Sequence, residues 1–248
     1  MAPVFDPYRL ASVSLDVLAA GRAGPGALAA RQRARLARLR ETIVRASRFY
    51  REHLAGIGPE VPLAELPPVT RQALMARFDD WVTDPQLHLV DLKAFTADPD
   101  AIGQAYLGRY VVWESSGTSH QPGVFVQDAA TMAVYDALEA LRRSAPLSTQ
   151  RWTDPLYLSE RLAFVGATGG HFASHVSIER LRQLNPWMRR SFRSFSILQP
   201  VAELVDALNG YAPTVIATYP TVAVLLADEA RRGALRFRPR ELWTGGET

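Results

Sequence analysis

Residues 214–243 read TVIATYPTVAVLLADEARRGALRFRPRELW, and this stretch decides the class of fold. TVIA is a short run rich in β-branched residues, typical of a buried strand. The Tyr219-Pro220 pair then opens a helix predicted over residues 221–231, and a second strand is predicted at residues 241–243. A strand, a helix and a strand in this order predict a unit of parallel sheet, and therefore an α/β fold.

The same alternation continues through the rest of the chain, so we expect a mixed, largely parallel sheet flanked by helices. Further strands are predicted at residues 110–113, 124–126 and 162–165. Further helices are predicted at residues 25–54, 71–81, 129–144, 178–184 and 203–208, the last of them ended by Asn209-Gly210. Residues 84–105 are predicted to be loop with short turns.

The composition excludes several kinds of chemistry. The chain has no cysteine, so it has no disulfide, no thiol nucleophile and no cysteine-ligated metal. The first residues, MAPVFDPYRL, lack the pattern of a secretory signal. No apolar run approaches the length of roughly 18 residues that a membrane-spanning helix needs. These features favour a cytoplasmic protein that binds neither membrane nor nucleic acid.

Arginine dominates the basic residues, and Lys93 is the only lysine. Eight arginines fall between Arg31 and Arg51, on the helix predicted at residues 25–54. A basic amphipathic helix can bind nucleic acid or a membrane surface, but a solvated helix face has the same pattern. We favour the solvated face and keep a basic interaction protein that uses residues 31–51 as a further alternative.

The loop between the first two predicted strands has an unusual composition. Residues 114–123 read ESSGTSHQPG, with hydroxyl side chains gathered around a glycine. Hydroxyls and free backbone amides can surround phosphate oxygens without a cationic side chain. The loop is not a Walker A motif, because it has no lysine and leads into a strand. From composition alone it is either an ordinary hairpin loop or a phosphate-binding loop.

The segment SSGTSHQPG at residues 115–123 resembles the phosphate-binding signature of adenylate-forming enzymes, whose usual form is Ser-Ser-Gly-Thr-Thr-Gly-Lys-Pro. Its neighbours resemble the phenylacetate–CoA ligase-like branch, including the coenzyme F synthetase-related members. The segments that carry this resemblance, in order, are SRFYREHL (47–54), LPPVTRQALMARFDDWV (66–82), GRYVVWESSGTS (108–119), GATGGHFAS (166–174), ATYPTVAVLLADEA (217–230) and LWTGGE (242–247).

This resemblance implies three groups of site residues. ATP phosphates would be bound by Ser115, Ser116, Gly117, Thr118 and Ser119. The adenine would lie beside Gly245, Gly246 and Glu247. The acyl-substrate pocket would include Gly169, Gly170, His171 and Phe172, although His171 could equally be a half-buried residue beside a Gly-Gly turn.

The chain also departs from the family pattern. His120 stands where the family has a glycine, and Gln121 stands where it has a lysine. The family's magnesium motif, its ribose-binding aspartate and its catalytic lysine would all lie beyond Thr248. We therefore expect an N-terminal fragment with no catalytic residue or metal ligand of its own, and with the small C-terminal domain absent.

The expected organisation is a helical N-terminal lead at residues 1–60 and a partial adenylation domain at residues 61–248. The resemblance implies a ligase that uses ATP and Mg²⁺ to convert a small-molecule carboxylate into an acyl-adenylate, with coenzyme A as acceptor. A non-catalytic remnant or a nucleotide-binding module of the same fold is the alternative. The oligomeric state stays open, with a homodimer among the options.

Overall fold

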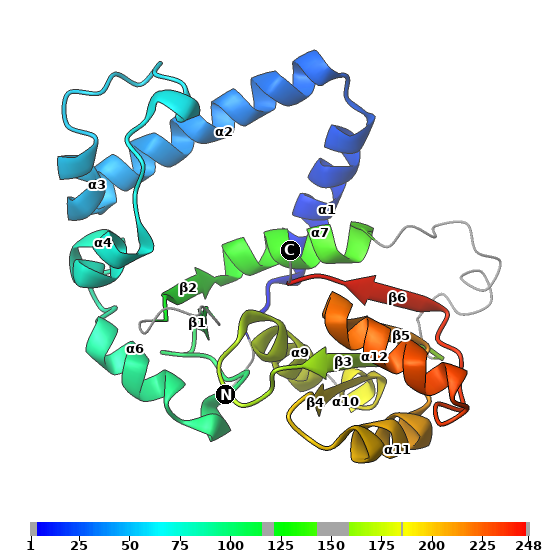
Figure 1. The fold of residues 1–248 in the computed structure, drawn as a ribbon. Helices are drawn as coiled ribbons and strands as arrows, with labels where there is room; N and C mark the ends of the chain where they lie inside the picture. The colour runs from blue at the N-terminus through cyan, green and yellow to red at the C-terminus, as the bar shows by residue number, and fades with distance from the viewer. Residues whose placement is uncertain (1–3, 116–121, 143–158, 185, 247–248) are drawn as a thin grey trace.

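The computed structural model describes residues 4–115, 122–142, 159–184 and 186–246 (Figure 1). Its helices are α1 (Pro7–Arg22), α2 (Pro25–Ala46), α3 (Arg48–His53), α4 (Arg71–Ala76), α5 (Phe78–Trp81), α6 (Leu89–Thr96), α7 (Ala129–Arg142), α9 (Ala173–Leu184), α10 (Pro186–Ser191), α11 (Val201–Tyr211) and α12 (Pro220–Arg231). Its strands are β1 (Tyr110–Glu114), β2 (Val124–Asp128), β3 (Leu162–Gly166), β4 (Phe192–Ser196), β5 (Val215–Thr218) and β6 (Glu241–Thr244). Among the described helices, none has both the length and the apolar character needed to cross a membrane.

Four strands form a parallel sheet in the order β4-β3-β5-β6. The central strand β3 is buried along its whole length, as its apolar sequence predicts. Helices connect the successive strands and cover the sheet, which confirms the expected α/β fold.

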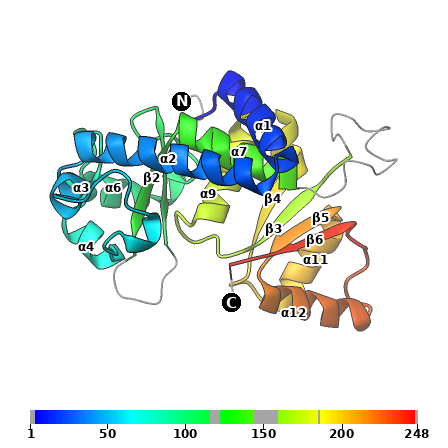
Figure 2. The same ribbon diagram turned by 90° about the horizontal axis from the view of Figure 1, so that it is seen from above.

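The two faces of the sheet pack against different helices (Figure 2). Ala163 and Val165 point to one face, where they join a core with residues of α11 and α12. Leu162 and Phe164 point to the other face and pack with Ile178 of α9. This alternation follows from the two-residue period of a strand.

Strands β1 and β2 form a separate antiparallel hairpin. Val111 and Trp113 pack toward α7 and α9, whereas Val112 packs with residues of α4, α5 and α6. Because Val176 of α9 lies in the first of these clusters and Ile178 packs on the sheet, α9 is the layer that joins hairpin and sheet.

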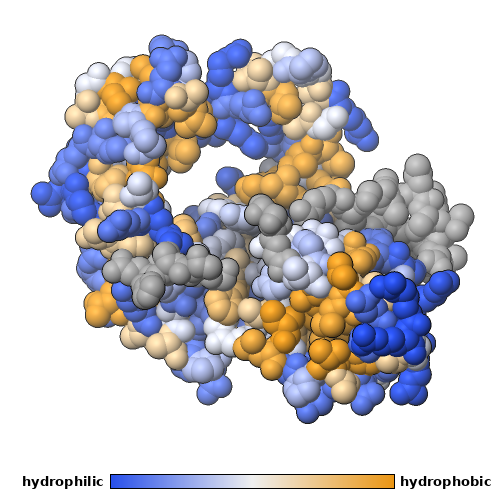
Figure 3. Space-filling view, in the orientation of Figure 1, coloured by the Kyte–Doolittle hydropathy of each residue, from blue (hydrophilic) through white to orange (hydrophobic). Residues whose placement is uncertain are grey.

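The N-terminal helices α1, α2 and α3 lie on the outside of the hairpin and the sheet (Figure 1). Helix α1 packs on α7, and α2 then crosses to α3 with an open space beneath it in the space-filling view (Figure 3). The apolar face predicted for this helix is only partly covered, because Leu39 is 54% exposed. Arg40, in contrast, is buried and donates hydrogen bonds to the carbonyl oxygens of Gly58, Pro59 and Val61.

The prediction of a single helix over residues 25–54 is wrong, because the helix is interrupted at Ser47, between α2 and α3. Ser47 has an extended backbone with φ −108° and ψ 123°, and its hydroxyl accepts a hydrogen bond from the Tyr50 N–H. The same hydroxyl donates to the carbonyl oxygen of Asp80, 3.1 Å away. The interruption therefore lets Ser47, at the start of α3, hydrogen-bond to Asp80 of α5.

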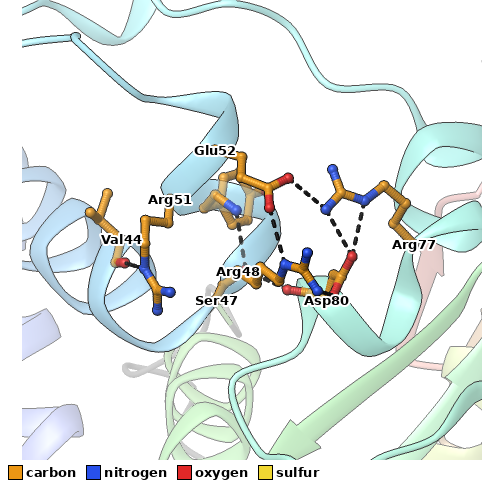
Figure 4. Close-up of polar contacts among 8 residues, drawn as sticks. Val44, Ser47, Arg48, Arg51, Glu52, Arg77 and Asp80 are labelled. Carbon is orange, nitrogen blue, oxygen red and sulfur yellow. Dashed lines mark hydrogen bonds and ion pairs between the residues drawn. The ribbon is translucent and has the colours of Figure 1, made fainter.

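Charged side chains reinforce this junction between α3 and α5 (Figure 4). The guanidinium of Arg77 lies 2.7 Å from a carboxylate oxygen of Glu52 and 2.8 Å from one of Asp80. Arg48 donates to the other carboxylate oxygen of Glu52. Hydrogen bonds to Arg77 and Arg48 hold the pKa of Glu52 below its ordinary value.

Three other element predictions need correction. The helix predicted at residues 71–81 is divided into α4 and α5 at Arg77, whose backbone leaves the helical region. The predicted loop at residues 84–105 contains α6, which buries Leu92 completely. Helix α11 continues through Asn209-Gly210 to Tyr211, because the Asn209 side chain binds the backbone of Ala234 and Arg236 instead of ending the helix.

Candidate nucleotide-binding site

Three strands of the sheet end at the same edge, and their carboxyl ends carry two of the predicted site segments. Thr218 at the end of β5 pairs with Val165 of β3 on one side and with Thr244 of β6 on the other. The Thr218 hydroxyl donates to the Val165 carbonyl oxygen at 2.7 Å, and Gly245 N–H donates to the Thr218 carbonyl oxygen at 3.2 Å. In open α/β sheets, ligands bind outside this edge.

The hairpin reaches the same region through one backbone contact. The N–H of Glu114, at the end of β1, donates to the carbonyl oxygen of His171 over 2.7 Å. Glu114 and Phe172 form an isolated parallel bridge. The segment 169–172 follows β3, so this contact places the predicted acyl-pocket segment beside the start of the predicted phosphate loop.

Ser115 closes the base of that loop. Its N–H donates to the Gly123 carbonyl oxygen at 2.9 Å, and its Oγ accepts a 2.8 Å hydrogen bond from the Gly123 N–H. The same Oγ accepts a 3.2 Å hydrogen bond from Arg71 Nη1. The predicted phosphate-binding residues Ser116, Gly117, Thr118 and Ser119 lie outside the described residues. Of the predicted phosphate-binding residues, Ser115 is thus the one that the structure describes, and its hydroxyl accepts two hydrogen bonds within the protein.

The carboxylate of Glu114 is held on the side of α6. The Thr96 hydroxyl donates to Glu114 Oε1 at 2.7 Å, and Thr96 itself is buried. A negative charge is thereby fixed at the residue that precedes the loop. No sequence pattern indicates this pair, because Thr96 lies in the segment 84–105, which is predicted to be loop.

His171 lies inside the protein, with its side chain only 1% exposed. Its ring lies 5.4 Å from that of Phe95, and neither ring nitrogen has a well-formed hydrogen bond within the described part of the chain. Burial lowers the pKa of His171, while backbone groups of Ala101 and Thr96 and the charge of Glu114 partly oppose this shift. The imidazole is therefore neutral at pH 7.

The other members of the predicted acyl-pocket segment are more accessible. Gly169 is exposed, and Gly170 and Phe172 are half-buried. The Phe172 ring folds back on Gly170, where an added Cβ would lie 3.3 Å from it. A role for this segment in binding an acyl group stays a prediction.

On the predicted adenine side, Gly245 and Gly246 are exposed and follow β6, while Glu247 lies outside the described residues. Gly246 has a positive φ of 84°, and a Cβ added there would lie 3.1 Å from the Tyr219 ring. Gly246 therefore lies close to the Tyr219 ring, and a larger residue there would press against it.

The described residues contain no group of three or more histidine, aspartate or glutamate side chains that could hold a metal ion. A hollow of about 570 Å³ lies elsewhere, between α1 and α7, and is lined by residues such as Arg9, Asp128 and Tyr135. Its side chains form no constellation of catalytic type, so the edge of the sheet is the stronger candidate.

Comparison with protein-family models and with curated proteins gives no match. The fold is similar to that of 2-hydroxyisobutyryl-CoA ligase. The crystal structure of its open conformation in complex with 2-HIB-AMP and CoA has a TM-score of 0.50 and 20% sequence identity, covering 87% of this chain and 43% of the ligase. The structure of its thioesterification state, with the same ligands, also gives 0.50 and 20%, covering 90% of this chain and 44% of the ligase.

The chain thus spans less than half the length of the ligase that it resembles. At this level of identity the similarity shows a shared fold. The class that the structure defines is therefore an α/β protein with a parallel four-stranded sheet, similar in fold to part of 2-hydroxyisobutyryl-CoA ligase.

Proposed function

We propose that this chain is part of an adenylate-forming ligase of the phenylacetate–CoA ligase-like branch. An oxygen of a carboxylate substrate would attack the α-phosphorus of ATP, and the bond from that phosphorus to the bridging oxygen of pyrophosphate would break. The products would be an acyl-adenylate and pyrophosphate. The thiol of coenzyme A would then attack the acyl carbon and release AMP.

The observation that supports this proposal most is the meeting of three predicted segments at one edge. The bond from Glu114 N–H to the His171 carbonyl oxygen brings the start of the phosphate loop beside the acyl segment. The bond from Gly245 N–H to the Thr218 carbonyl oxygen brings the adenine segment to the same edge of the sheet. Neighbouring strands lie about 4.8 Å apart, so β3 and β6, which flank β5, are separated by about 10 Å at this edge.

The proposed contribution of these residues is positioning. Backbone amides and the hydroxyls of Ser116, Thr118 and Ser119 would bind the phosphates, with Ser115 holding the two ends of the loop together. Gly245, Gly246 and Glu247 would lie beside the adenine, and residues 169–172 would shape the acyl pocket. Fixed hydrogen-bond donors stabilise the charge that develops on a transferring group.

We propose that the other groups needed for the reaction belong to a longer protein. We propose a helical lead at residues 1–60 and a partial adenylation domain at residues 61–248, followed in a longer protein by the magnesium ligands and a C-terminal domain. Mg²⁺ would neutralise phosphate charge when bound. An enzyme that consumes ATP and coenzyme A would work in the cytoplasm on a small-molecule carboxylate.

The test is carboxylate-dependent release of pyrophosphate from two proteins. One is the 248-residue chain, and the other is a chain whose reading frame continues past Thr248. We expect release from the longer chain alone and binding of Mg-ATP by both. Binding without release in both proteins would favour the non-catalytic nucleotide-binding module. Absence of binding in both would reject the proposed function.

One observation favours a second candidate, a basic interaction surface. Arg33, Arg38 and Arg45 are exposed on α2, and the structure gives them no ion pair within the described residues. Such a helix can bind a polyanion. Affinity for nucleic acid that falls steeply with salt, and falls further when these three arginines are replaced by glutamine, would support this candidate.

A further inference from the structure

The predicted phosphate loop lacks a positive charge of its own. Residues 114–123 contain neither lysine nor arginine, and the only lysine of the chain, Lys93, is an exposed residue of α6. A nucleoside triphosphate carries several negative charges. Arginine and lysine bind phosphate oxygens through charge-assisted hydrogen bonds, which are roughly twice as strong as neutral ones. A cationic side chain from another part of the chain would have to lie beside the loop to bind these phosphates.

Arg71 is the arginine that contacts the base of the loop. It is the first residue of α4, and Nη1 of its guanidinium donates to Ser115 Oγ over 3.2 Å. The side chain is half-buried, so its charge lies in a medium less screened than bulk water. A guanidinium has five N–H donors in a planar fork, so it can bind Ser115 Oγ and further acceptors at the same time.

The other end of the loop leaves room for the Arg71 side chain. An added Cβ at Gly123 would lie 2.9 Å from Cδ of Arg71 and 2.9 Å from the Phe125 ring. Any larger residue at position 123 would therefore displace the arginine or the phenylalanine. The methylene stem of Arg71 passes against Gly123 while its guanidinium reaches Ser115, so the side chain bridges both ends of the loop.

We propose that Arg71 supplies the positive charge by which this chain binds the phosphates of a nucleoside triphosphate beside Ser115 and Gly123. This inference rests on the proposed function, since it identifies a further binding residue for the same site. An arginine at the base of the loop would compensate for the absence of lysine and arginine within it.

Arg71 could instead be only a structural clamp that closes the loop, and four variants separate the two roles. Arg71→Gln removes the charge, and Arg71→Lys keeps it without the planar fork. Arg71→Gln combined with Gln121→Lys returns a cation to the loop at a different position. Arg231→Gln is the matched control, because it removes an equal charge from an exposed residue of α12 that pairs with Asp228 in its own helix.

The measurements are the dissociation constants of Mg-ATP and of inorganic tripolyphosphate, together with thermal unfolding of each variant. We expect Arg71→Gln to bind both ligands roughly tenfold to a hundredfold more weakly, the range for a lost hydrogen bond to a charged group. Arg71→Lys and the double variant should each recover part of this loss. Arg231→Gln should bind like the unchanged chain.

Two results would overturn the inference while leaving the proposed function in place. One is an Arg71→Gln chain that binds both ligands as tightly as the unchanged protein. The other is a loss of binding that accompanies a large fall in melting temperature and that a lysine at position 121 does not reverse, as a structural clamp would give. If the unchanged chain binds neither ligand, the proposed function fails and the inference fails with it.

Discussion

The N–H of Glu114 donates a 2.7 Å hydrogen bond to the carbonyl oxygen of His171, and this contact ties the β1–β2 hairpin to the segment that follows β3. The two residues are far apart in the sequence: Glu114 ends strand β1 of the hairpin, whereas His171 follows strand β3 of the parallel sheet. Beside it, the Thr96 hydroxyl holds the Glu114 carboxylate. The loop that begins at Ser115 is therefore anchored to α6 on one side and to the parallel sheet on the other.

Ser115 and Thr118 should respond differently to replacement by alanine. The Ser115 hydroxyl accepts hydrogen bonds from Gly123 N–H and from Arg71, so Ser115→Ala should lower the free energy of unfolding by about 1 kcal/mol. Thr118→Ala should change the free energy of unfolding by no more than about 0.5 kcal/mol, because the sequence predicts a loop there and surface substitutions usually stay within this range. In a longer, active chain, Thr118→Ala should slow adenylation roughly a hundredfold, because the loss of one hydrogen-bond donor to a developing phosphoryl charge typically has an effect of this size.

Urea unfolding and pyrophosphate release measure these two effects separately. Restoring the family residues with His120→Gly and Gln121→Lys should leave adenylation equal or faster. A Thr118→Ala chain that melts much earlier while keeping its full adenylation rate would show that the loop is a structural hairpin connection.

The parts of the fold that the sequence predicts well are those with strong local patterns. The run LAFV at β3 is apolar throughout, and β3 is buried at every position. Strand β4, with the sequence FRSFS, was missed because it is an edge strand whose polar and apolar residues are mixed and mostly half-buried. Helix α6 was missed for a related reason, since its eight residues are too few for a clear helical period.

Long-range contacts account for the other differences. Ser47 breaks the predicted N-terminal helix for a bond to Asp80, which lies 33 residues away. Asn209 does not end α11, because its side chain binds the chain beyond α12. The contact of Arg71 with Ser115 spans 44 residues, and no local pattern marks it. Sequence motifs could thus name the candidate loop but could not find the arginine beside it.

The ion pair between Asp136 of α7 and Arg180 of α9 should be important for stability. Arg180 is only 1% exposed and also donates to the carbonyl oxygen of Val4. Burial raises the pKa of Asp136, and Arg180 offsets only part of this shift. Asp136→Ala should cost roughly 3–5 kcal/mol, because it leaves a buried guanidinium without its counter-charge.

Two further variants test this explanation by urea unfolding. Asp228→Ala removes a carboxylate from an exposed pair with Arg231 and should cost no more than about 0.5 kcal/mol. Asp136→Leu combined with Arg180→Met removes both buried charges and should recover much of the loss. Equal costs for Asp136→Ala and Asp228→Ala would mean that the buried pair is not important for stability.

Two histidines should give opposite pH dependences of stability. The pKa of buried His171 is lowered, so the unfolded chain binds the proton more readily than the native one. Its contribution is complete above about pH 6.5, the ordinary value, and is lost as the pH falls from there toward the lowered pKa. A hydrogen bond to Asp79 raises the pKa of His88, so the stability that His88 contributes is complete below about pH 6.5 and is lost as the pH rises through the raised pKa.

The free energy of unfolding, measured between about pH 5 and about pH 8, checks both signs. His171→Gln should make the loss of stability toward acid smaller than in the unchanged chain. His88→Gln should make that loss larger. If His171→Gln leaves the slope unchanged, the ring takes up its proton in the folded protein as readily as in the unfolded one.

Gly246 and Gly233 offer a matched pair for the predicted adenine side. Both have positive φ, 84° and 77° respectively, so alanine is strained at either position. A Cβ at Gly233 would meet nothing within 4 Å, whereas one at Gly246 would lie 3.1 Å from the Tyr219 ring. Gly233→Ala should therefore report backbone strain alone, about 1 kcal/mol in the free energy of unfolding. Gly246→Ala should cost a similar amount or slightly more, because the ring must give way by a few tenths of an ångström.

The two variants should differ more clearly in ligand binding. If Gly246 lies beside the adenine, alanine there should weaken the binding of Mg-ATP and leave the binding of tripolyphosphate unchanged, because tripolyphosphate has no base. Gly233→Ala should change neither dissociation constant. This pattern differs from the one expected for Arg71→Gln, which should weaken the binding of both ligands. The base and phosphate ends of the site can therefore be tested independently. A Gly246→Ala chain that binds Mg-ATP as tightly as the unchanged protein would remove residues 245–247 from the nucleotide site, and the phosphate loop would then have to be judged on Arg71 and Ser115 alone.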